Sequence, residues 1–438
     1  MNQLLKQNQK IVSSNGIEYA VKDFLGDGTQ GEVYRVTTSG KDLALKWYKQ
    51  GFATKEQWDV LQNLITIGPP TAQFLWPIEL VKINNIPGFG YIMPLRGSNY
   101  KGLIDLMKGK IDPSFNVLIT AGFQLADNYF HLHSLGLCYS DINFGNAFFD
   151  PNIGEVLICD NDNVVVNKSD LGSVNGTLYF MAPEIVRGEA RPSRDTDLYS
   201  LSVLLFYILH ISHPLEGKKQ SAIHAWDYPA MLKIFGKEPV FIFDPNDNSN
   251  RPDPEVHKCA ETYWNIYPKF MKNLFTRAFT DGLKDPENGR VQENEWRSSL
   301  IRLRDSTIYC QKCGSENFYD LDAIRENPSF NTKCWNCKSN ISIPSRIKIN
   351  SIIAMLNYNT ILYQHHLDGM SYNFEKKVAQ MSSNPKNPDI WGLKNLTDVT
   401  WVAEKPDNSK IEVKPGQTIP LMSGLIIDFG ISKGEIRN

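Results

Sequence analysis

A glycine-rich stretch near the start of the chain raises the first chemical question. In LGDGTQGEVYRV, Gly26, Gly28 and Gly31 lie between two segments of alternating apolar residues, which predicts a β-hairpin with a glycine-rich turn. Because glycine has no side chain, such a turn can approach a ligand closely. Lys46, on the strand predicted after the hairpin, can reach back under the turn. Dinucleotide-binding folds share this glycine spacing, but there a helix follows the turn, whereas a strand is predicted here.

More polar residues follow at defined spacing along the chain. Asp141 and Asn146 lie five apart in the loop YSDINFGN after a predicted helix, and Asp160 ends an apolar strand in LICDNDN. The segment GTLYFMAPE contains Ala182-Pro183-Glu184. Asp197 stands at the head of an apolar helix, where we expect it to cap the helix and brace the loop around Asp141. Each motif is weak alone, but their order and spacing together are specific.

This ordered series resembles the protein kinase family. The glycine turn with Val33 is similar to the kinase glycine-rich loop, Lys46 to the lysine of the third strand, and Asp141 with Asn146 to the catalytic loop. Asp160 is similar to the metal-binding aspartate, and the Ala-Pro-Glu segment to its kinase counterpart. The resemblance implies a two-lobed fold that transfers the γ-phosphoryl group of ATP to serine or threonine hydroxyls of a protein substrate.

The resemblance also implies a role for each polar group. Phosphoryl transfer depends mainly on positioning and charge neutralisation. Lys46 would hold the α- and β-phosphates, while Asn146 and Asp160 would supply the oxygen ligands that Mg²⁺ (or Mn²⁺) prefers. Asp141 would orient the acceptor hydroxyl and take its proton. The glycine turn would then cover the nucleotide phosphates.

The adenine site follows from the same resemblance. Val33 and Ala44 would belong to the nucleotide site, and Met93 would be the gatekeeper residue at its back. Pro94 follows where kinases use only a carbonyl group, so its missing N–H has no cost. Arg96 would then offer its backbone N–H and C=O to the adenine.

Two ion pairs are expected. The partner of Lys46 should lie on the helix that follows its strand, where Glu56 and Asp59 are both candidates on one face. We favour Glu56 because its side chain is longer. Glu184 should pair with a buried arginine, for which Arg290 in ENGRVQENEW is the best candidate.

Three departures from the kinase pattern leave alternatives open. Ser140 replaces the arginine that pairs with a phosphorylated activation loop, so we expect that switch to be absent. Asn143 stands where serine/threonine kinases carry a lysine on the γ-phosphate, and Asp160-Asn161-Asp162 replaces Asp-Phe-Gly. A nucleotide-binding pseudokinase scaffold is therefore one alternative, and a small-molecule kinase is another. The Ala-Pro-Glu segment and the long loop before it favour protein substrates.

Two further stretches, IGPPTAQFLWPIELV and FGYIMPL, refine the resemblance. With the departures above they are similar to an atypical bacterial kinase subfamily encoded in tellurium-resistance-type clusters. Genes for a von Willebrand A-type protein and a metal-dependent protein phosphatase often lie beside such kinases. The resemblance therefore implies these two proteins as partners.

Four clustered cysteines predict a second site. They form two CxxC pairs with 20 residues between the pairs: Cys310, Cys313, Cys334 and Cys337. Four thiolates at this spacing suit a tetrahedral Zn²⁺ in a zinc ribbon. Iron in a rubredoxin-like site and a redox pair of dithiols are the alternatives. Since four cysteines leave no open coordination position, we expect a structural role.

The pattern of elements predicts an α+β chain in which a β-rich kinase lobe precedes a helical one. The expected elements are a hairpin over 17–47, a helix over 52–67, strands over 147–149 and 156–158, and helices over 115–135, 197–210 and 263–279. The expected domains are a kinase N-lobe (15–94), a kinase C-lobe (95–304), a zinc ribbon (305–345), and a helical linker with a β-rich module (346–438).

The C-terminal region is expected to combine a helix with a small β-sandwich. Residues 349–381 are predicted as helix, and alternating residues with Pro-Gly and Ser-Gly turns predict strands from Trp391 onward. The stretch VKPGQTIPLMSGLIIDFG resembles forkhead-associated-like sandwiches, but their phosphothreonine-binding residues are not visible. A docking module is the simpler interpretation.

The composition of the chain excludes several other classes of protein. The 438 residues carry a formal net charge of −2, which argues against a nucleic-acid partner held by phosphate contacts. The first ten residues lack the apolar segment of a secretory signal, and no apolar run is long enough to cross a membrane, so we expect a cytoplasmic protein. His131 and His133, two apart on a predicted helix, point in different directions, so we expect His133 to be structural.

Overall fold

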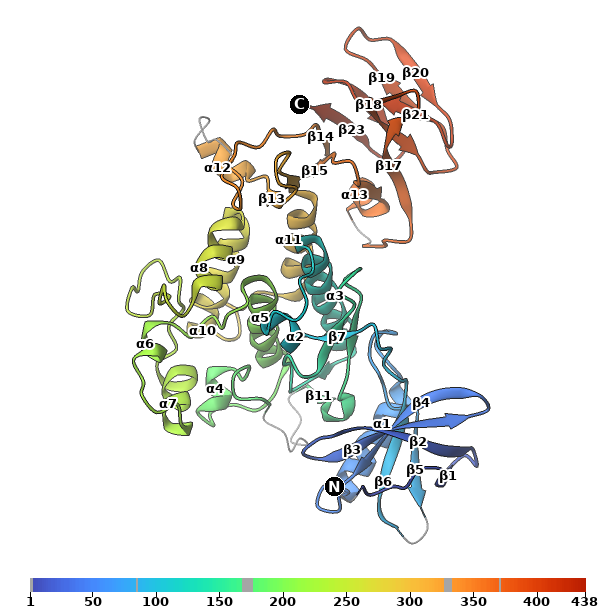
Figure 1. The fold of residues 1–438 in the computed structure, drawn as a ribbon, viewed down its shortest axis with the longest axis vertical. Coiled ribbons are helices and arrows are strands. Elements are labelled where there is room, and N and C mark those ends of the chain that lie inside the picture. The colour runs from blue at the N-terminus through green and yellow to red at the C-terminus, as the bar shows by residue number, and fades with distance from the viewer. Residues whose placement is uncertain (1–2, 84–85, 168–175, 327–332, 370–371) are drawn as a thin grey trace. The chain divides into compact units, whose positions relative to one another are not determined.

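The computed structural model describes residues 3–83, 86–167, 176–326, 333–369 and 372–438 (Figure 1). The chain divides into two compact units. The first comprises Met1–Trp264 and Asn273–Arg297, and the second comprises Asn265–Lys272 and Ser298–Asn438.

The N-terminal part of the first unit is a closed antiparallel barrel with the strand order β1-β2-β3-β4-β6-β5. Its strands are β1 (Lys10–Ser13), β2 (Glu18–Asp27), β3 (Gly31–Thr38), β4 (Lys41–Tyr48), β5 (Glu79–Ile83) and β6 (Ile86–Met93). The predicted hairpin around the glycine turn is therefore confirmed. The expected lobe boundary at residue 15 is too late, because β1 buries Ile11 and pairs with both β2 and β5. Four residues of strand are too short for their alternation to stand out in a sequence.

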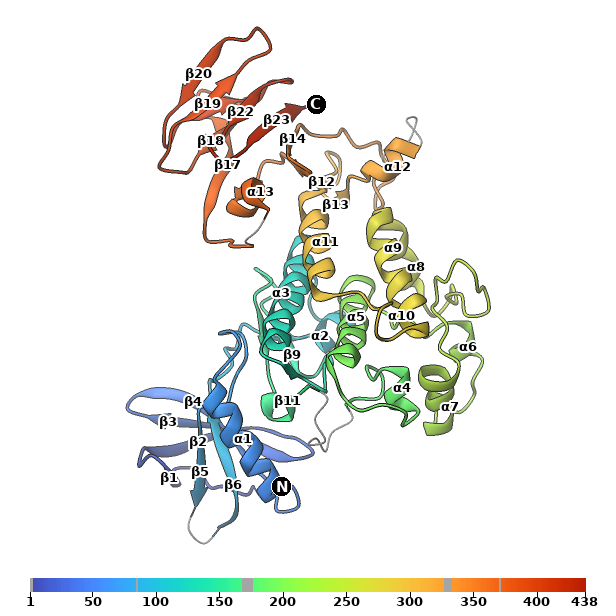
Figure 2. The ribbon, with the colours of Figure 1, turned by 180° about the vertical axis from the view of Figure 1, so that it is seen from behind.

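Helix α1 (Lys55–Ile67) follows β4 and lies against the barrel (Figure 2). It begins where the Thr54 side chain accepts a hydrogen bond from the N–H of Gln57, and it ends at Gly68. Leu61 and Leu64 form its buried stripe. This confirms the helix predicted over 52–67 to within three residues.

The remainder of the first unit is mainly helical, with short strands between the helices. Its helices begin with α2 (Leu103–Met107), α3 (Phe115–Ser134), α4 (Pro183–Val186), α5 (Arg194–His210), α6 (Lys218–Ser221) and α7 (Tyr228–Leu232). They continue with α8 (Lys258–Ile266), α9 (Lys269–Ala278), α10 (Asp281–Lys284) and α11 (Glu293–Asp305), of which α8, α9 and α11 also include residues of the second unit. The strands are β7 (Lys101–Gly102), β8 (Leu137–Cys138), β9 (Ala147–Phe149), β10 (Val156–Ile158) and β11 (Val165–Val166). The predicted strands over 147–149 and 156–158 are confirmed.

Helices α3 and α5 pack against each other and support the loops of the site. Every residue of α5 from Thr196 to His210 is buried, which explains its uninterrupted apolar sequence. The expectation that Asp197 caps this helix is wrong. Ser193 is the N-cap and forms a capping box with Thr196, because the helix begins one turn before Asp197.

The helix predicted over 263–279 is also wrong in part. The structure has two helices there, α8 and α9, separated at Tyr267 and Pro268. Proline lacks the N–H that would continue the first helix and is well suited to begin the next one. Because the apolar periodicity of the sequence continues across Tyr267 and Pro268, the sequence pattern predicts one continuous helix.

The described part of the second unit contains a short hairpin, short helices and two antiparallel sheets. The hairpin is β12 (Thr307–Tyr309) with β13 (Glu316–Phe318), followed by α12 (Leu321–Glu326). A six-stranded sheet has the order β15-β14-β23-β22-β19-β20, and a four-stranded sheet has the order β16-β17-β18-β21. Their strands are β14 (Arg346–Ile349), β15 (Ile352–Met355), β16 (Ile361–Tyr363), β17 (Lys377–Asn384), β18 (Asn387–Asn395), β19 (Trp401–Glu404), β20 (Lys410–Val413), β21 (Thr418–Pro420), β22 (Ile426–Asp428) and β23 (Lys433–Arg437).

The helix predicted over 349–381 is wrong. In the described part of this segment the structure has strands β15, β16 and β17, and only the short helix α13 (Gln364–Asp368). Asn350 adopts a left-handed conformation (φ 51°) in a two-residue turn that pairs Ile349 with Ile352. Ile352 and Ile353 are β-branched and favour strands. The apolar residues thus belong to several short strands.

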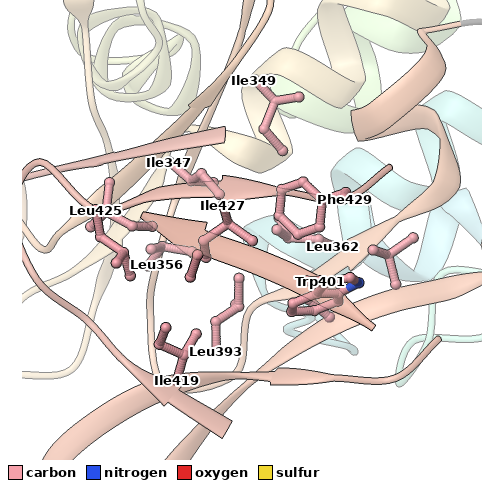
Figure 3. Close-up of a cluster of buried hydrophobic side chains, with 14 of the residues drawn as sticks. Ile347, Ile349, Leu356, Leu362, Leu393, Trp401, Ile419, Leu425, Ile427 and Phe429 are labelled. Atoms are coloured by element: carbon pink, nitrogen blue, oxygen red, sulfur yellow. The ribbon is translucent and has the colours of Figure 1, made fainter. Parts of the chain in front are cut away.

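Both sheets contribute to one apolar core (Figure 3). Ile347, Ile427 and Trp401 from the six-stranded sheet share it with Leu393 and Ile419 from the four-stranded sheet. Within the described part of the chain, no helix combines the length and hydrophobicity needed to span a bilayer.

Candidate functional site

The glycine-rich turn between β2 and β3 lies over a cluster of charged side chains. At Gly31 a Cβ atom would lie 2.4 Å from the carbonyl oxygen of Trp47, so only glycine fits without a backbone shift. The Gln30 side chain lies 3.4 Å from Lys46 Nζ and 3.4 Å from the Asn163 amide oxygen. The turn therefore contacts both Lys46 and the segment that follows β10.

Lys46 on β4 is a buried cation between two carboxylates. Its ammonium lies 2.8 and 3.0 Å from the two oxygens of Asp162 and also contacts Asp160. Burial by itself lowers the pKa of Lys46, but the charges of Asp162 and Asp160 outweigh burial and raise the pKa above its usual value. Lys46 thus stays charged.

Asp160 is held in an unusual conformation at the end of β10. Its backbone is left-handed (φ 57°, ψ 44°), which costs energy in a residue other than glycine and is typical of functional sites. Its side chain is 34% exposed, whereas that of Asp162 is fully buried. Burial and the nearby charge of Asp162 raise the pKa of Asp160 to about 6, although Lys46 opposes the shift.

The structure does not bring Glu56 or Asp59 to Lys46, which corrects the expected ion pair. Glu56 is exposed near the N-terminal end of α1, and Asp59 forms a 2.9 Å ion pair with Lys55 in solvent. The residue of α1 that faces the site is Gln57. Gln57 lies between Glu56 and Asp59 in the sequence, but on a helix it points in a different direction from either of them. The sequence pattern therefore predicted the wrong face of α1 for the contact with Lys46.

Asp141 and Asn146 meet in the loop between β8 and β9. The Asn146 amide group donates to Asp141 Oδ2 (3.2 Å) and to the Asp141 carbonyl (3.0 Å). Asp141 Oδ1 accepts hydrogen bonds from the N–H (2.8 Å) and hydroxyl (2.9 Å) of Thr177. The N–H of Cys159 donates to the carbonyl of Asn146, which brings Asp160 next to this loop. Thr177, a residue of the predicted activation loop to which no motif assigned a role at Asp141, holds the carboxylate in place.

Asp197 braces the same loop, as predicted. Its carboxylate accepts hydrogen bonds from the N–H groups of Tyr139 (2.5 Å) and Ser140 (3.0 Å). His133 lies 3.1 Å from Asp197 on one side and contacts Glu293 on the other. Burial lowers the pKa of His133, but the two carboxylates outweigh it and raise the pKa to about 9. The structural role predicted for His133 is therefore confirmed as a buried cation behind the loop.

Asn143 is turned into the loop instead of toward the open side of the site. It is buried, donates to the Asp141 carbonyl (2.9 Å) and accepts from the N–H of Gly145 (2.7 Å). Ser140 occupies a left-handed conformation (φ 69°) beside Asp197. These two residues shape the loop and add no positive charge to it.

The residues expected around adenine lie together on the barrel. Val33 is paired with Lys46 across β3 and β4, and Ala44 is paired with Met93 across β4 and β6. Val33, Ala44 and Met93 belong to one apolar cluster. The guanidinium of Arg96 packs on the ring of Phe148 (3.8 Å).

The predicted pair of Glu184 and Arg290 is confirmed. The Arg290 guanidinium donates to Glu184 at 2.6 Å and to the carbonyl of Asp195 at 2.6 Å. The Arg290 side chain is only 2% exposed. The pair connects α4 to the start of α5 and to the loop before α11.

The donor set around Asp160 fits a hard divalent cation. The Asn146 amide nitrogen is used by Asp141, which leaves its Oδ1 as an acceptor, and Asp160 offers a partly exposed carboxylate. Both are oxygen donors of the type that Mg²⁺ binds. Asn146 and Asp160 would hold the ion, which would neutralise phosphate charge.

The four predicted cysteine ligands converge in the second unit. Their sulfur atoms all lie within 4.8 Å of one another, with 3.5 Å between Cys310 and Cys337 and 3.6 Å between Cys313 and Cys334. A tetrahedral site with Zn–S bonds of about 2.3 Å has sulfurs about 3.8 Å apart. The cluster therefore fits Zn²⁺.

The two CxxC turns have the same backbone pattern. Cys310 N–H donates to Ser315 and Gly314 N–H to Cys310, while Cys334 and Lys338 repeat this pattern with Ser339. Gly314 (φ 74°) and Lys338 (φ 61°) are both left-handed. Hydrogen bonds from the Ser339 side chain and from backbone N–H groups lower the pKa of Cys310 to about 6, which favours the thiolate that a metal requires.

Comparison with known proteins agrees with this arrangement. Residues 95–278 match the family model described as protein kinase domain. A probable serine/threonine-protein kinase of Dictyostelium discoideum is 25% identical over 260 residues, which cover 57% of this chain and 16% of that protein. A probable LIM domain-containing serine/threonine-protein kinase of the same organism is 24% identical over 58% of this chain and 37% of its own length. Ribosomal protein S6 kinase alpha-4 of Mus musculus is 34% identical over 97 residues, which are 21% of this chain and 12% of that protein.

The matches and the fold support one assignment: residues 95–278 are similar to a protein kinase domain. The described lobes have the mixed helix and strand content of such a domain. The matched regions cover little more than a third of these relatives at most.

Proposed function

We propose that this chain is an ATP-dependent protein kinase that phosphorylates serine or threonine side chains. The observation that carries the proposal is the convergence of Lys46, Asp141, Asn146 and Asp160 in one hydrogen-bonded network beside a glycine-rich turn. The serine/threonine specificity is supported by the names of the two Dictyostelium discoideum relatives.

In this proposal each polar group has one task. Lys46 holds the α- and β-phosphates as a fixed positive charge, and Asn146 and Asp160 hold Mg²⁺, which neutralises charge on the phosphates. Asp141 orients the acceptor hydroxyl and takes its proton, while Thr177 keeps the carboxylate in place. The Ala-Pro-Glu segment, anchored through Glu184, supports a protein substrate over a small molecule.

Labelling with γ-³²P-ATP and Mg²⁺ tests the proposal. We expect autophosphorylation or labelling of a generic protein substrate by the wild-type chain, and a loss of about 100-fold or more in Asp141→Asn, because general base catalysis is removed. Phosphoamino acid analysis of the product distinguishes serine and threonine from tyrosine. An Asp141→Asn variant as active as wild type would contradict the assigned base.

A pseudokinase scaffold is the second candidate, and the buried Asn143 is the observation that favours it. Without a lysine at that position, the loop provides less positive charge for the transferred phosphoryl group. In that case ATP would raise the melting temperature, Lys46→Ala would abolish the rise, and no label would be transferred. The second alternative, a small-molecule kinase, would give ADP formation without protein labelling.

We also propose that the four cysteines bind one structural Zn²⁺ in a zinc ribbon. Elemental analysis should find about one zinc per chain, lost in Cys313→Ser. Iron in its place would overturn the choice of metal, and a disulfide formed on mild oxidation would favour the redox alternative. The β-rich module is proposed as a docking module. The von Willebrand A-type protein and the phosphatase remain partners implied only by the resemblance.

A further inference from the structure

The buried acid beside Lys46 lies on an unexpected segment of the chain. Asp162 belongs to the short 3-10 turn Asn161–Asn163 directly after Asp160, and its side chain is fully buried. Both of its oxygens contact Lys46 Nζ, at 2.8 and 3.0 Å, and the Tyr48 hydroxyl donates to it as well. A buried carboxylate is stable only with such partners, so Asp162 and Lys46 depend on each other.

Asp160 is less suited than Asp162 to hold Lys46 in position. It contacts Lys46 through one oxygen, is partly exposed, and is the proposed metal ligand. A carboxylate engaged with a metal is a weaker partner for a lysine. The Asp162 side chain is fully buried, and its other partner is the neutral Tyr48 hydroxyl. Its negative charge therefore remains available to Lys46.

Helix α1 contributes only a neutral group to this cluster. The Gln57 amide donates to the Asp162 carbonyl (3.0 Å) and to the Tyr48 hydroxyl (3.1 Å). The acids of α1, Glu56 and Asp59, lie in solvent. The charge that balances Lys46 therefore comes from the metal-binding segment itself.

We propose that Asp162 is the positioning residue of Lys46, in place of an acid on α1. This inference rests on the proposed kinase function. In this arrangement the turn Asn161–Asn163, which directly follows the proposed metal ligand Asp160, also holds Lys46 in position for the phosphates. A movement of α1 that leaves this turn in place does not break the ion pair.

The first test measures activity and nucleotide affinity. Asp162→Asn keeps the shape and removes the charge, so kcat/KM for ATP should fall by about tenfold or more because Lys46 is misplaced. Asp105→Asn, an identical change on α2, is the matched control and should stay at the wild-type level. If the loss occurred in Glu56→Gln instead, a helix-borne partner would replace Asp162 and overturn the inference.

A charge-relocation variant separates positioning from mere structural support. Gln57→Glu in the Asp162→Asn background returns a negative charge to the cluster from α1, and it should recover part of the lost kcat/KM. In the wild-type background the same change adds a second negative charge next to Asp162 and should not raise activity. No recovery in the double variant, with both proteins folded by circular dichroism, would overturn the positioning role.

A stability cycle tests the ion pair without any activity. Asp162→Asn should lower the melting temperature of the wild type. In a Lys46→Met background it should raise the melting temperature, because it removes a buried carboxylate that has lost its cation. A decrease in both backgrounds would refute the pairing. If the cycle holds but the wild type transfers no phosphate and binds no ATP, the proposed function fails while the ion pair stands.

Discussion

The buried imidazole of His133 makes stability depend on pH in a direction that the structure predicts. His133 lies between Asp197 and Glu293, and its pKa is raised to about 9 from an ordinary 6.5. Because the folded chain binds this proton more tightly than the unfolded chain does, the stabilisation is complete below about pH 6.5. It is lost as pH rises through about 9.

The size of the effect follows from the difference in pKa. A pKa difference of about 2.5 units at about 1.4 kcal/mol per unit corresponds to about 3–4 kcal/mol. Burial raises the pKa of Glu293, but hydrogen bonds from His133 and Arg194 outweigh burial and lower the pKa to about 2. The contact of Glu293 with His133 therefore also weakens as the pH falls below about 4.5. The contact should therefore be strongest between about pH 4.5 and 6.5.

Denaturant-dependent hydrogen exchange in α3 and α5, read by mass spectrometry from pH 6 to 10, measures this effect within the first unit. The comparison is between wild type and His133→Gln, since groups that do not contact His133 titrate equally in both proteins. We expect the difference in unfolding free energy to shrink by about 3 kcal/mol over this range. A difference that stays constant with pH would refute a charged His133. Because Asp197 also binds the N–H groups of Tyr139 and Ser140 next to Asp141, we expect the proposed kinase activity to fall in parallel.

Three further outcomes follow from the structure. Arg290→Ala should destabilise the first unit by about 3–5 kcal/mol, because it leaves Glu184 largely buried without a cation. A loss below about 1 kcal/mol in chemical denaturation would contradict this. Gly31→Ala should cost about 1–3 kcal/mol because its Cβ would meet the Trp47 carbonyl, whereas Gly26→Ala, with open space around it, should be nearly neutral in the same melting assay. A chelator that removes the proposed Zn²⁺ from the four-cysteine site should lower the melting temperature of the second unit, and re-addition of Zn²⁺ should restore it. A melting temperature unchanged by the chelator would exclude a stabilising metal.

Patterns that are local in the sequence predicted much of this protein. The hairpin around the glycine turn, the helix α3 and the strands β9 and β10 follow from short-range periodicity, which depends on neighbouring residues alone. The two CxxC pairs predicted their own convergence, because the spacing within each pair sets a turn. The pairing of Glu184 with Arg290 was predicted from the resemblance, which encodes long-range contacts that periodicity does not.

Only the tertiary structure decided which acid balances Lys46. Glu56 and Asp162 are both acidic, and the sequence does not show which carboxylate is buried and which lies in water. The choice depends on the left-handed backbone at Asp160 and on the face that α1 presents, both of which arise from packing across the two lobes. The strands within 349–381 were hidden for a related reason, since apolar residues do not reveal which partner strand will pair with them.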